Sequence, residues 1–327
     1  MKYIFWLQLI LFALFSCKQE TKHPIDFYYW RSNFKVSTAE KEIVKKLDVK
    51  QIYIRFFDVD KTENQLKPIG LIRNFTPNQF AVNYIPTVFI TNRTFLNSSP
   101  NQIKQLAKNV NQLINQIAVA SQLNTFNEIQ IDCDWTKTTK NNYFLFLEEL
   151  KKISEKEISA TLRLHQVKFK NEEGIPPLNK MVLMCYATEN PNEVEVKNSI
   201  LDLALAKDYL KDLNNYPIQL DVALPIYSWA IITNHLGKIK LVNSFSEDQL
   251  KNKPVKSLGN GIYEVTDDFF IEKFYLSKGF KIKVEDVSPE LLKDIKSFLD
   301  DKLNYDYSII YYHLDEQFIK QYNLNQL

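Results

Sequence analysis

Two carboxylates lie two positions apart in residues 128–136, a segment whose composition is typical of a β-strand. Side chains alternate along a strand, so Gln130, Asp132 and Asp134 share one face, and the apolar residues between them share the other. The two acids are then about 6–7 Å apart along the backbone. Ionising both in a confined site is costly, so the pKa of one should rise. The spacing predicts a general acid; a helix cap or an ion pair with an arginine is the alternative.

The next strand candidate supplies polar partners for these acids. Alternation along residues 158–165 places Thr161, Arg163 and His165 on the inward face. We expect Arg163 either to neutralise Asp132 or to form a purely structural ion pair. His165 is expected either to line the site as a hydrogen-bonding residue or to act as a base.

Aromatic side chains lie near several strand ends. Tyr227 and Trp229 share one phase at the end of the seventh strand candidate, and Trp30, Trp135 and Tyr186 lie near the ends of three others. Aromatic faces stack on the apolar faces of sugar rings, while carboxylates and phenol hydroxyls bind sugar hydroxyls. We expect these side chains to gather at one mouth and bind a carbohydrate. For any one of them, filling a core is the alternative.

Along the chain, short β-branched and aromatic runs alternate with amphipathic stretches of helix length. Helices are expected at residues 38–47, 101–122, 140–153, 201–213 and 289–303, turns or a hairpin at 238–274, and a short strand at 281–285. The expected main strands are residues 25–30, 51–57, 83–91, 128–135, 158–164, 180–187, 218–226 and 307–313. Strands that alternate with helices predict a single α/β domain, a (β/α)8 TIM barrel with insertions, whose site lies at the carboxyl ends of the strands. A doubly wound open sheet is the alternative, but the glycine-rich first turn typical of that fold is missing.

The composition excludes several classes of function. The 41 basic and 39 acidic residues give a net charge of +2, too balanced to favour nucleic acid. The 6 glycines form neither a P-loop nor a dinucleotide fingerprint, and the 4 histidines do not fall at helical metal-ligand spacing, so we expect no cofactor and no metal. Cys133 and Cys185 are expected to be buried free thiols, because their strands are about 9–10 Å apart, beyond disulfide reach.

The first residues form an apolar leader. One lysine precedes a run at residues 3–15 that is broken by a single glutamine, which fits a secretory signal and is short for a membrane span. The run ends in Leu-Phe-Ser-Cys17, which resembles a bacterial lipobox, in which the cysteine is lipidated; a plain signal peptide is the alternative. We predict a lipoprotein signal peptide at 1–16, a tether at 17–24 and a barrel domain at 25–327. The expected location is the outer membrane of a bacterial envelope, attached through the lipid on Cys17.

Three segments resemble motifs of one enzyme family. Ile-Gln-Ile-Asp132-Cys-Asp134-Trp135 is similar to the fourth-strand signature D-x-x-D-x-D-x-E of family 18 glycoside hydrolases, the chitinase-like barrels. Met-Cys-Tyr186 is similar to the sixth-strand M-x-Y of that family, and Ala-Leu-Pro-Ile-Tyr227 to its seventh-strand G-x-P-x-Y-G. The whole chain also resembles a group of barrel lipoproteins from Bacteroidetes-type bacteria.

The resemblance implies a carbohydrate partner and a catalytic set of Asp134 as acid, Asp132 as its charge-coupled neighbour, and Tyr186. Two positions depart from the motif: Ile129 replaces its first aspartate, and Thr136 replaces its catalytic glutamate. A threonine cannot protonate a leaving group. We therefore expect a monomeric, envelope-anchored glycoside hydrolase or, alternatively, a non-catalytic glycan-binding or interaction lipoprotein.

Overall fold

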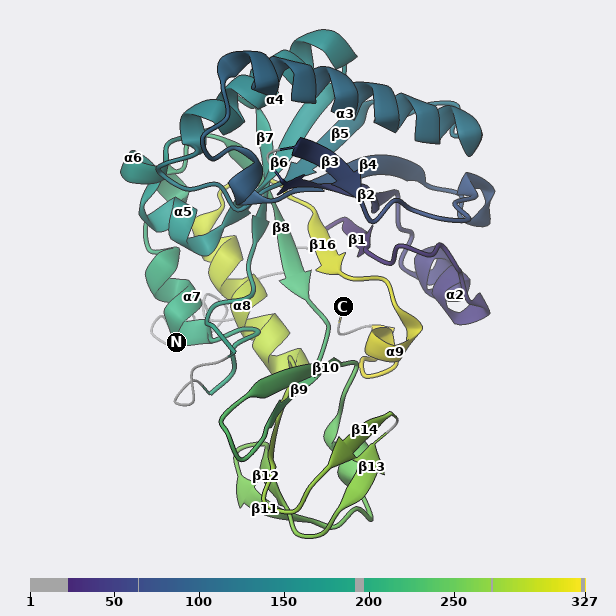
Figure 1. The fold of residues 1–327 in the computed structure, drawn as a ribbon, viewed down its shortest axis with the longest axis vertical. Helices are drawn as coiled ribbons and strands as arrows, with labels where there is room; N and C mark the ends of the chain where they lie inside the picture. Colours follow the sequence, from purple (N-terminus) through teal and green to yellow (C-terminus); the bar gives the residue numbers. More distant parts are fainter. Residues whose placement is uncertain (1–22, 64, 192–196, 272, 325–326) are drawn as a thin grey trace, which may run out of the picture.

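The fold is a closed barrel of parallel strands with helices outside, as Figure 1 shows for the computed structural model. The structure describes residues 23–63, 65–191, 197–271, 273–324 and 327. The barrel strands are β1 (Ile25–Tyr29), β2 (Gln51–Thr62), β4 (Asn83–Ile90), β5 (Glu128–Asp132), β6 (Glu157–Arg163), β7 (Lys180–Met184), β8 (Gln219–Pro225) and β16 (Ile309–Tyr312). Strand β1 pairs in parallel with both β2 and β16, which closes the barrel. The predicted TIM barrel is confirmed.

Helices and one hairpin connect the barrel strands. The α-helices are α2 (Thr38–Lys46), α3 (Pro100–Ala120), α4 (Lys140–Ser154), α5 (Leu164–Lys168), α6 (Lys170–Glu173), α7 (Leu203–Tyr209), α8 (Pro289–Lys302) and α9 (Glu316–Ile319). Strand β3 (Gln65–Ile69) pairs antiparallel with the extended end of β2. Helix α2 begins with a capping box, in which the side chains of Ser37 and Glu40 each accept a hydrogen bond from the other residue's backbone N–H, and the spacing of serine and glutamate is the sequence signature of such a box. The longest helix, α3, begins with a similar box at Ser99 and Gln102.

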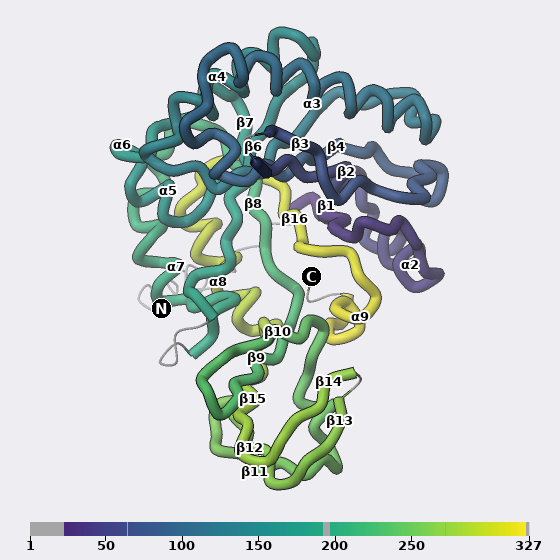
Figure 2. The backbone as a smooth tube through the Cα atoms, in the orientation of Figure 1, coloured from purple at the N-terminus to yellow at the C-terminus, as the bar shows by residue number. Residues whose placement is uncertain are grey.

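An antiparallel sheet is inserted between β8 and α8, where we expected turns or a hairpin at 238–274 and a short strand at 281–285. Its strands are β9 (Trp229–Thr233), β10 (Ile239–Asn243), β11 (Val255–Gly259), β12 (Ile262–Val265) and β15 (Lys281–Glu285), in the order β10-β9-β15-β12-β11. A small hairpin, β13 (Phe269–Ile271) and β14 (Phe274–Leu276), lies beside this sheet. Figure 2 traces the chain from β8 into the insert and back to α8. The prediction of insertions is therefore right, but the insert is a folded lobe.

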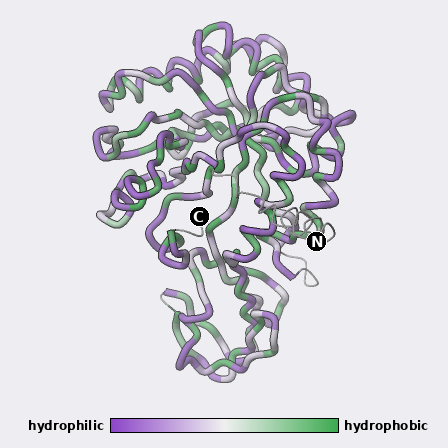
Figure 3. Tube along the Cα trace, turned by 180° about the vertical axis from the view of Figure 1, so that it is seen from behind, coloured by the Kyte–Doolittle hydropathy of each residue, from purple (hydrophilic) through white to green (hydrophobic). Residues whose placement is uncertain are grey.

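The buried apolar residues form three clusters, of which a small one that includes Tyr28 and Ile310 lies inside the barrel. The main core lies between the barrel and its helices and includes Phe57, Leu106 and Leu292. The insert has its own core, with Ala230, Phe245 and other buried residues. Figure 3 shows hydrophobic colouring concentrated along the central strands and hydrophilic colouring on much of the outer helices. Within the described residues, no helix is both long and apolar enough to cross a membrane.

Charged side chains fill the barrel end opposite the strands' carboxyl ends. Lys180, at the start of β7, has its ammonium 3.2 Å from carboxylate oxygens of both Glu128 and Asp221. The carboxylate of Asp26 accepts a hydrogen bond from the backbone N–H of Gln51. These paired charges fill the end of the barrel at which the strands begin, which we call the barrel floor. The end at which the strands finish is therefore the one that can hold a ligand.

Candidate functional site

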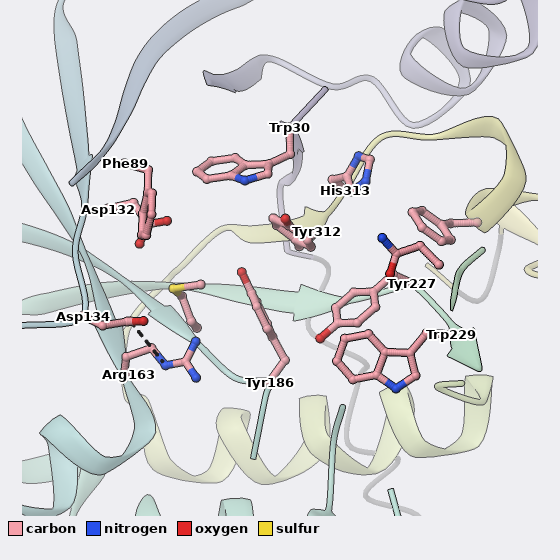
Figure 4. Close-up of a pocket in the computed structure, with 13 residues that line it drawn as sticks. Trp30, Phe89, Asp132, Asp134, Arg163, Tyr186, Tyr227, Trp229, Tyr312 and His313 are labelled. Carbon is pink, nitrogen blue, oxygen red and sulfur yellow. Dashed lines mark ion pairs between the residues drawn. The ribbon is translucent and has the colours of Figure 1, made fainter. Parts of the chain in front are cut away.

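A cavity of about 400 Å³ lies at the carboxyl ends of the barrel strands. It is lined by Trp30, Phe89, Asp132, Asp134, Arg163, Met184, Tyr186, Tyr227, Trp229, Asn243, Tyr312, His313 and Phe318. Figure 4 shows the acids on one side of the cavity and the tyrosines and tryptophans across it. All but two of these residues come from barrel strands, their following loops or the C-terminal segment; Trp229 and Asn243 come from the inserted sheet, so Trp229 does not end the seventh barrel strand as expected. The site thus lies where the fold class places it.

The two aspartates differ in environment although they are two residues apart. Asp132 ends β5, is buried, and accepts a hydrogen bond from the Thr161 hydroxyl at 2.7 Å. Burial, and next the negative charge of Asp134, raise the pKa of Asp132 to about 7. The Asp134 side chain is 54% exposed. The predicted elevation of one pKa therefore falls on Asp132.

Arg163 lies at the cavity edge and pairs with Asp134, not with Asp132 as one expectation had it. Its Nε is 3.6 Å from Asp134 Oδ1, and one Nη donates to the Ala187 carbonyl at 3.3 Å. Figure 4 marks the ion pair. The guanidinium therefore balances the exposed acid, and the hydroxyl of Thr161 is left as the hydrogen-bond donor to the buried acid.

Aromatic rings form the wall opposite the acids. Tyr227 contacts Trp229 and Tyr312 at ring-centroid distances of 5.3 and 5.8 Å, and Tyr186 packs against Tyr312 at 5.4 Å. Trp30 joins the group through Tyr312 at 5.8 Å. Edge and tilted contacts of this kind hold rings rigidly and leave faces free for a ligand.

The Tyr186 hydroxyl stands out among the polar groups of this wall. It is buried and has no hydrogen-bond partner in the described residues. Burial raises its pKa well above the usual range, so the hydroxyl keeps its proton at neutral pH. Figure 4 shows this hydroxyl pointing toward the middle of the cavity. An unpaired buried hydroxyl costs stability, and a ligand that pairs with it recovers that cost.

Two residues that were expected at the mouth are absent from the cavity lining. Trp135 is completely buried, stacks on Tyr143 at 5.1 Å, and donates its indole N–H to the Glu173 carbonyl. The alternation of side chains stops when β5 ends at Asp132, so strand phase no longer predicts where Trp135 points. Strand β6 likewise ends at Arg163, so His165 lies on the short helix α5 and strand alternation no longer predicts its direction.

Several lining residues have no counterpart in the sequence-based site. Phe89, Met184, Tyr312 and Phe318 add apolar surface. His313 follows β16, and burial lowers its pKa to about 4, so its imidazole is neutral at physiological pH. Tyr312 has the inward phase of the expected last strand and was therefore within reach of sequence reasoning. Asn243 was not, since it depends on the fold of the insert.

Thr136 lies outside the cavity lining. Its hydroxyl is 3.0 Å from the Thr138 hydroxyl and 3.4 Å from the Asn92 amide nitrogen. The backbone N–H of Thr136 donates to the Thr139 hydroxyl at 2.9 Å. These contacts organise the start of α4. Within the residues that the structure describes, no group of three or more His, Cys, Asp or Glu side chains is arranged to hold a metal ion.

The two cysteines lie close to the site but do not enter it. Cys133 and Cys185 are both fully buried and are free thiols. They follow β5 and β7, which β6 separates in the sheet. The prediction of unpaired, buried cysteines is confirmed.

Solved structures with the same fold are chitinase-like enzymes. The spore cortex-lytic enzyme SleL of Bacillus cereus is 15% identical, with a TM-score of 0.55 over 93% of this chain and 76% of that one. A chitinase from Chromobacterium violaceum is 11% identical, with a TM-score of 0.54 over 92% and 98% of the two chains. A point mutant of Group II chitinase catalytic domain 2 from Ostrinia furnacalis, solved with (NAG)5, is 12% identical, with a TM-score of 0.50 over 90% and 91%.

These likenesses show a shared fold, that of the family 18 chitinase-like barrels, and confirm the predicted resemblance at that level. At the level of sequence, no family model matches the chain, and no match to a curated protein was found.

Proposed function

We propose that this protein binds a saccharide at the mouth of its barrel and does not hydrolyse it. The support is the composition of the cavity: two carboxylates on one side, and aromatic faces across from them, with the Tyr186 hydroxyl pointing from the aromatic wall toward the middle. Aromatic faces match the apolar faces of sugar rings, and the polar groups match their hydroxyl and amide groups.

The observation that argues against hydrolysis is the placement of the carboxylates. Among the described lining residues, both carboxylates, Asp132 and Asp134, come from the end of one strand, and none faces them. In the two-carboxylate mechanism the two groups flank the glycosidic bond from different sides. The substrate-assisted mechanism of family 18 barrels needs a single acid instead, at the motif position that Thr136 occupies in this chain. Asp58 on β2 and Glu189 after β7 are two further acids that could supply a second carboxyl group. The Arg55 Nε donates to Asp58 at 2.6 Å. Neither Asp58 nor Glu189 lines the cavity.

A second candidate function, hydrolysis, is favoured by one observation. The pKa of Asp132 is raised to about 7, which suits a general acid at neutral pH. The acid role that the motif assigns to Asp134 is less well supported, because Asp134 is exposed and paired with Arg163. If the barrel hydrolyses a glycan, Asp132 is the acid that the geometry favours.

The saccharide class that we propose is an oligomer of N-acetylglucosamine. The supporting likeness is the Ostrinia chitinase domain solved with (NAG)5, which shares the barrel fold. We therefore take (GlcNAc)5 as the first probe.

Calorimetric titration of (GlcNAc)5 into the full chain tests the proposal. The wild type should bind, and Trp229→Ala should weaken binding by about 10-fold or more, the usual effect of truncating an aromatic anchor. Asp134→Asn should weaken it less. Phe270→Ala is the matched control, because Phe270 is 61% exposed on β13 and does not line the cavity. Equal losses in Trp229→Ala and Phe270→Ala would place binding elsewhere.

We further propose that a lipid on Cys17 anchors the protein to a bacterial outer membrane. Cys17 lies outside the described residues, so the support is the lipobox-like sequence and the direction in which the chain leaves the barrel. The ring of His23 stacks on Tyr307 at 4.1 Å, and its Nε2 is 2.8 Å from Asp300. Tyr307 precedes β16, so His23 lies at the barrel end opposite the cavity. An anchored barrel would then present its cavity away from the membrane.

A further inference from the structure

The inserted sheet contributes a buried carboxylate that contacts the cavity wall. Glu285 ends β15 and is 3% exposed. Its Oε2 accepts hydrogen bonds from the indole N–H of Trp229 at 2.8 Å and from the Ser199 hydroxyl at 2.5 Å. Its Oε1 lies 2.6 Å from the ammonium of Lys283. A buried carboxylate with these contacts is strongly held.

Glu285 joins three parts of the chain at one point. Trp229 begins the first strand of the insert and pairs in register with Glu285 at the end of the last strand. Ser199 belongs to the segment between β7 and α7. A second bond joins the same segments, because the Asn198 amide donates to the Asp286 carbonyl at 2.6 Å. Both junctions of the insert are thus tied to the barrel at Glu285.

The contact determines which side of Trp229 faces the cavity. Figure 4 shows the indole nitrogen of Trp229 on the side away from Tyr227. The indole nitrogen is held by its hydrogen bond to Glu285, so the rest of the indole ring lies beside Tyr227. The two ring centroids are 5.3 Å apart. Without its acceptor, the indole would be free to rotate about its side-chain bonds and lose this orientation.

We propose that Glu285 is a positioning residue that fixes the indole of Trp229 at the cavity wall and so couples the inserted sheet to ligand affinity. The effect on affinity rests on the proposed saccharide function. The effect on the indole does not, so the two can fail separately.

The indole N–H resonance of Trp229 in a ¹H–¹⁵N spectrum of the full chain tests the contact without any ligand. Trp229→Phe assigns the peak by removing it. Glu285→Ala should move this peak, while the other tryptophan peaks and those of the barrel backbone stay in place. Glu264→Ala is the matched control, because Glu264 lies on β12 of the same sheet opposite Lys281 and Lys256. A Trp229 peak that Glu285→Ala leaves unmoved would overturn the proposal.

Glu285→Gln keeps a side-chain oxygen that can accept from the indole at nearly the same volume. If the alanine variant does not fold, the glutamine variant gives the same readout, because the indole then donates to a neutral oxygen and its peak moves. An unmoved peak would again overturn the proposal.

A double-mutant cycle with (GlcNAc)5 tests the coupling. Glu285→Ala should weaken binding by about 10-fold, and Glu285→Gln should restore it to within about 3-fold of the wild type, as expected for loss and retention of a hydrogen bond to a charged group. In Trp229→Phe, which has no N–H, a further Glu285→Ala change should add almost nothing. An equal loss in both backgrounds would show that Glu285 acts by another route. If (GlcNAc)5 does not bind the wild type, the proposed function fails while the spectrum still decides the contact.

Discussion

At the scale of single residues, the two aspartates show how burial separates chemically identical side chains. Asp132 lies inside the barrel with one hydroxyl donor, and Asp134 lies at the rim beside a guanidinium. Because of this difference, Asp132 lowers the stability of the fold at high pH: an ionised carboxylate that is buried without an ion-pair partner costs free energy.

Asp132→Asn should change how stability depends on pH. The folded-state pKa of about 7 exceeds the unfolded value near 4, so between these values the folded chain holds a proton that the unfolded chain has lost. Wild-type stability should therefore fall from about pH 4 to pH 7 and level off above that range. Asp132→Asn should be more stable than the wild type at pH 8, by up to about 3 kcal/mol, and nearly equal at pH 4.

Urea unfolding at pH 4 and pH 8 measures this difference. Asp134→Asn is the control: its exposed side chain should change stability by less than about 0.5 kcal/mol at neutral pH. Parallel profiles for the wild type and Asp132→Asn would contradict the raised pKa.

Tyr186→Phe should separate binding from stability. Among the described residues the Tyr186 hydroxyl has no hydrogen-bond partner, so its removal should leave stability within about 0.5 kcal/mol of the wild type. Affinity for (GlcNAc)5 should fall by about 10-fold, because the ligand loses a buried donor. Calorimetry and thermal unfolding on one sample measure both quantities.

The contrasting variant is Tyr28→Phe. The Tyr28 hydroxyl donates to Gln130 Oε1 at 2.8 Å in the barrel interior, so this change should cost about 1–3 kcal/mol. If Tyr186→Phe lost as much stability as Tyr28→Phe, its hydroxyl would have a structural role.

At the scale of elements, sequence patterns predicted the barrel strands well and the insert poorly. The barrel strands are buried on both faces and therefore appear in the sequence as runs of β-branched residues, which made them recognisable. The start of α2 was recognisable from its capping box. The five strands of the insert's sheet are at most 5 residues long, and one of them, Lys281–Glu285, alternates apolar with charged residues along its whole length. Their pairing joins residues up to 56 positions apart, as between Trp229 and Glu285. Two residues show what sequence patterns could not predict. The direction of Trp135 was missed because side-chain alternation stops where β5 ends. The contact of Glu285 with Trp229 was missed because the pairing of strands far apart in the chain cannot be derived from residue spacing.

The inserted sheet should be removable without loss of the barrel. Its core is separate from the main core, and β9 and β15 are register partners that form a ready hairpin. Joining Thr233 to Lys281 through Asn-Gly, which favours a two-residue hairpin turn, should change barrel stability by less than about 1 kcal/mol. Saccharide binding should persist, because Trp229 and Glu285 remain.

Thermal unfolding and (GlcNAc)5 titration of this shortened chain test the separation. A second deletion that also removes residues 229–285 should abolish binding while the barrel still folds. Collapse of the barrel in the first deletion would mean that the two cores depend on each other.

At the scale of the whole molecule, the two ends of the barrel have different roles. The floor is filled by Lys180 and its acidic partners, and His23, the first described residue, packs on Tyr307 on that side. The cavity and the insert lie at the other end. This polarity suits a protein tethered at one end that binds a ligand at the other.

Cys17→Ala should move the protein from the membrane fraction to the soluble fraction without changing its thermal unfolding, because Cys17 lies outside the described fold, which begins at His23. Fractionation of bacterial cells that express each form measures this, with Cys133→Ser as a cysteine control that keeps the anchor. A wild-type protein found only in the soluble fraction would contradict the lipid anchor.

Whether the barrel holds a saccharide without cutting it is the central question, and equilibrium dialysis of the wild-type chain against fluorescently labelled (GlcNAc)5 answers it directly. Excess label on the protein side measures binding, and mass analysis of both chambers measures the length of the saccharide in the same sample. The expected result is retained label that remains a pentasaccharide after prolonged incubation. Shorter products would contradict the binding role and favour hydrolysis through Asp132, and an even distribution of label would contradict a site for this saccharide.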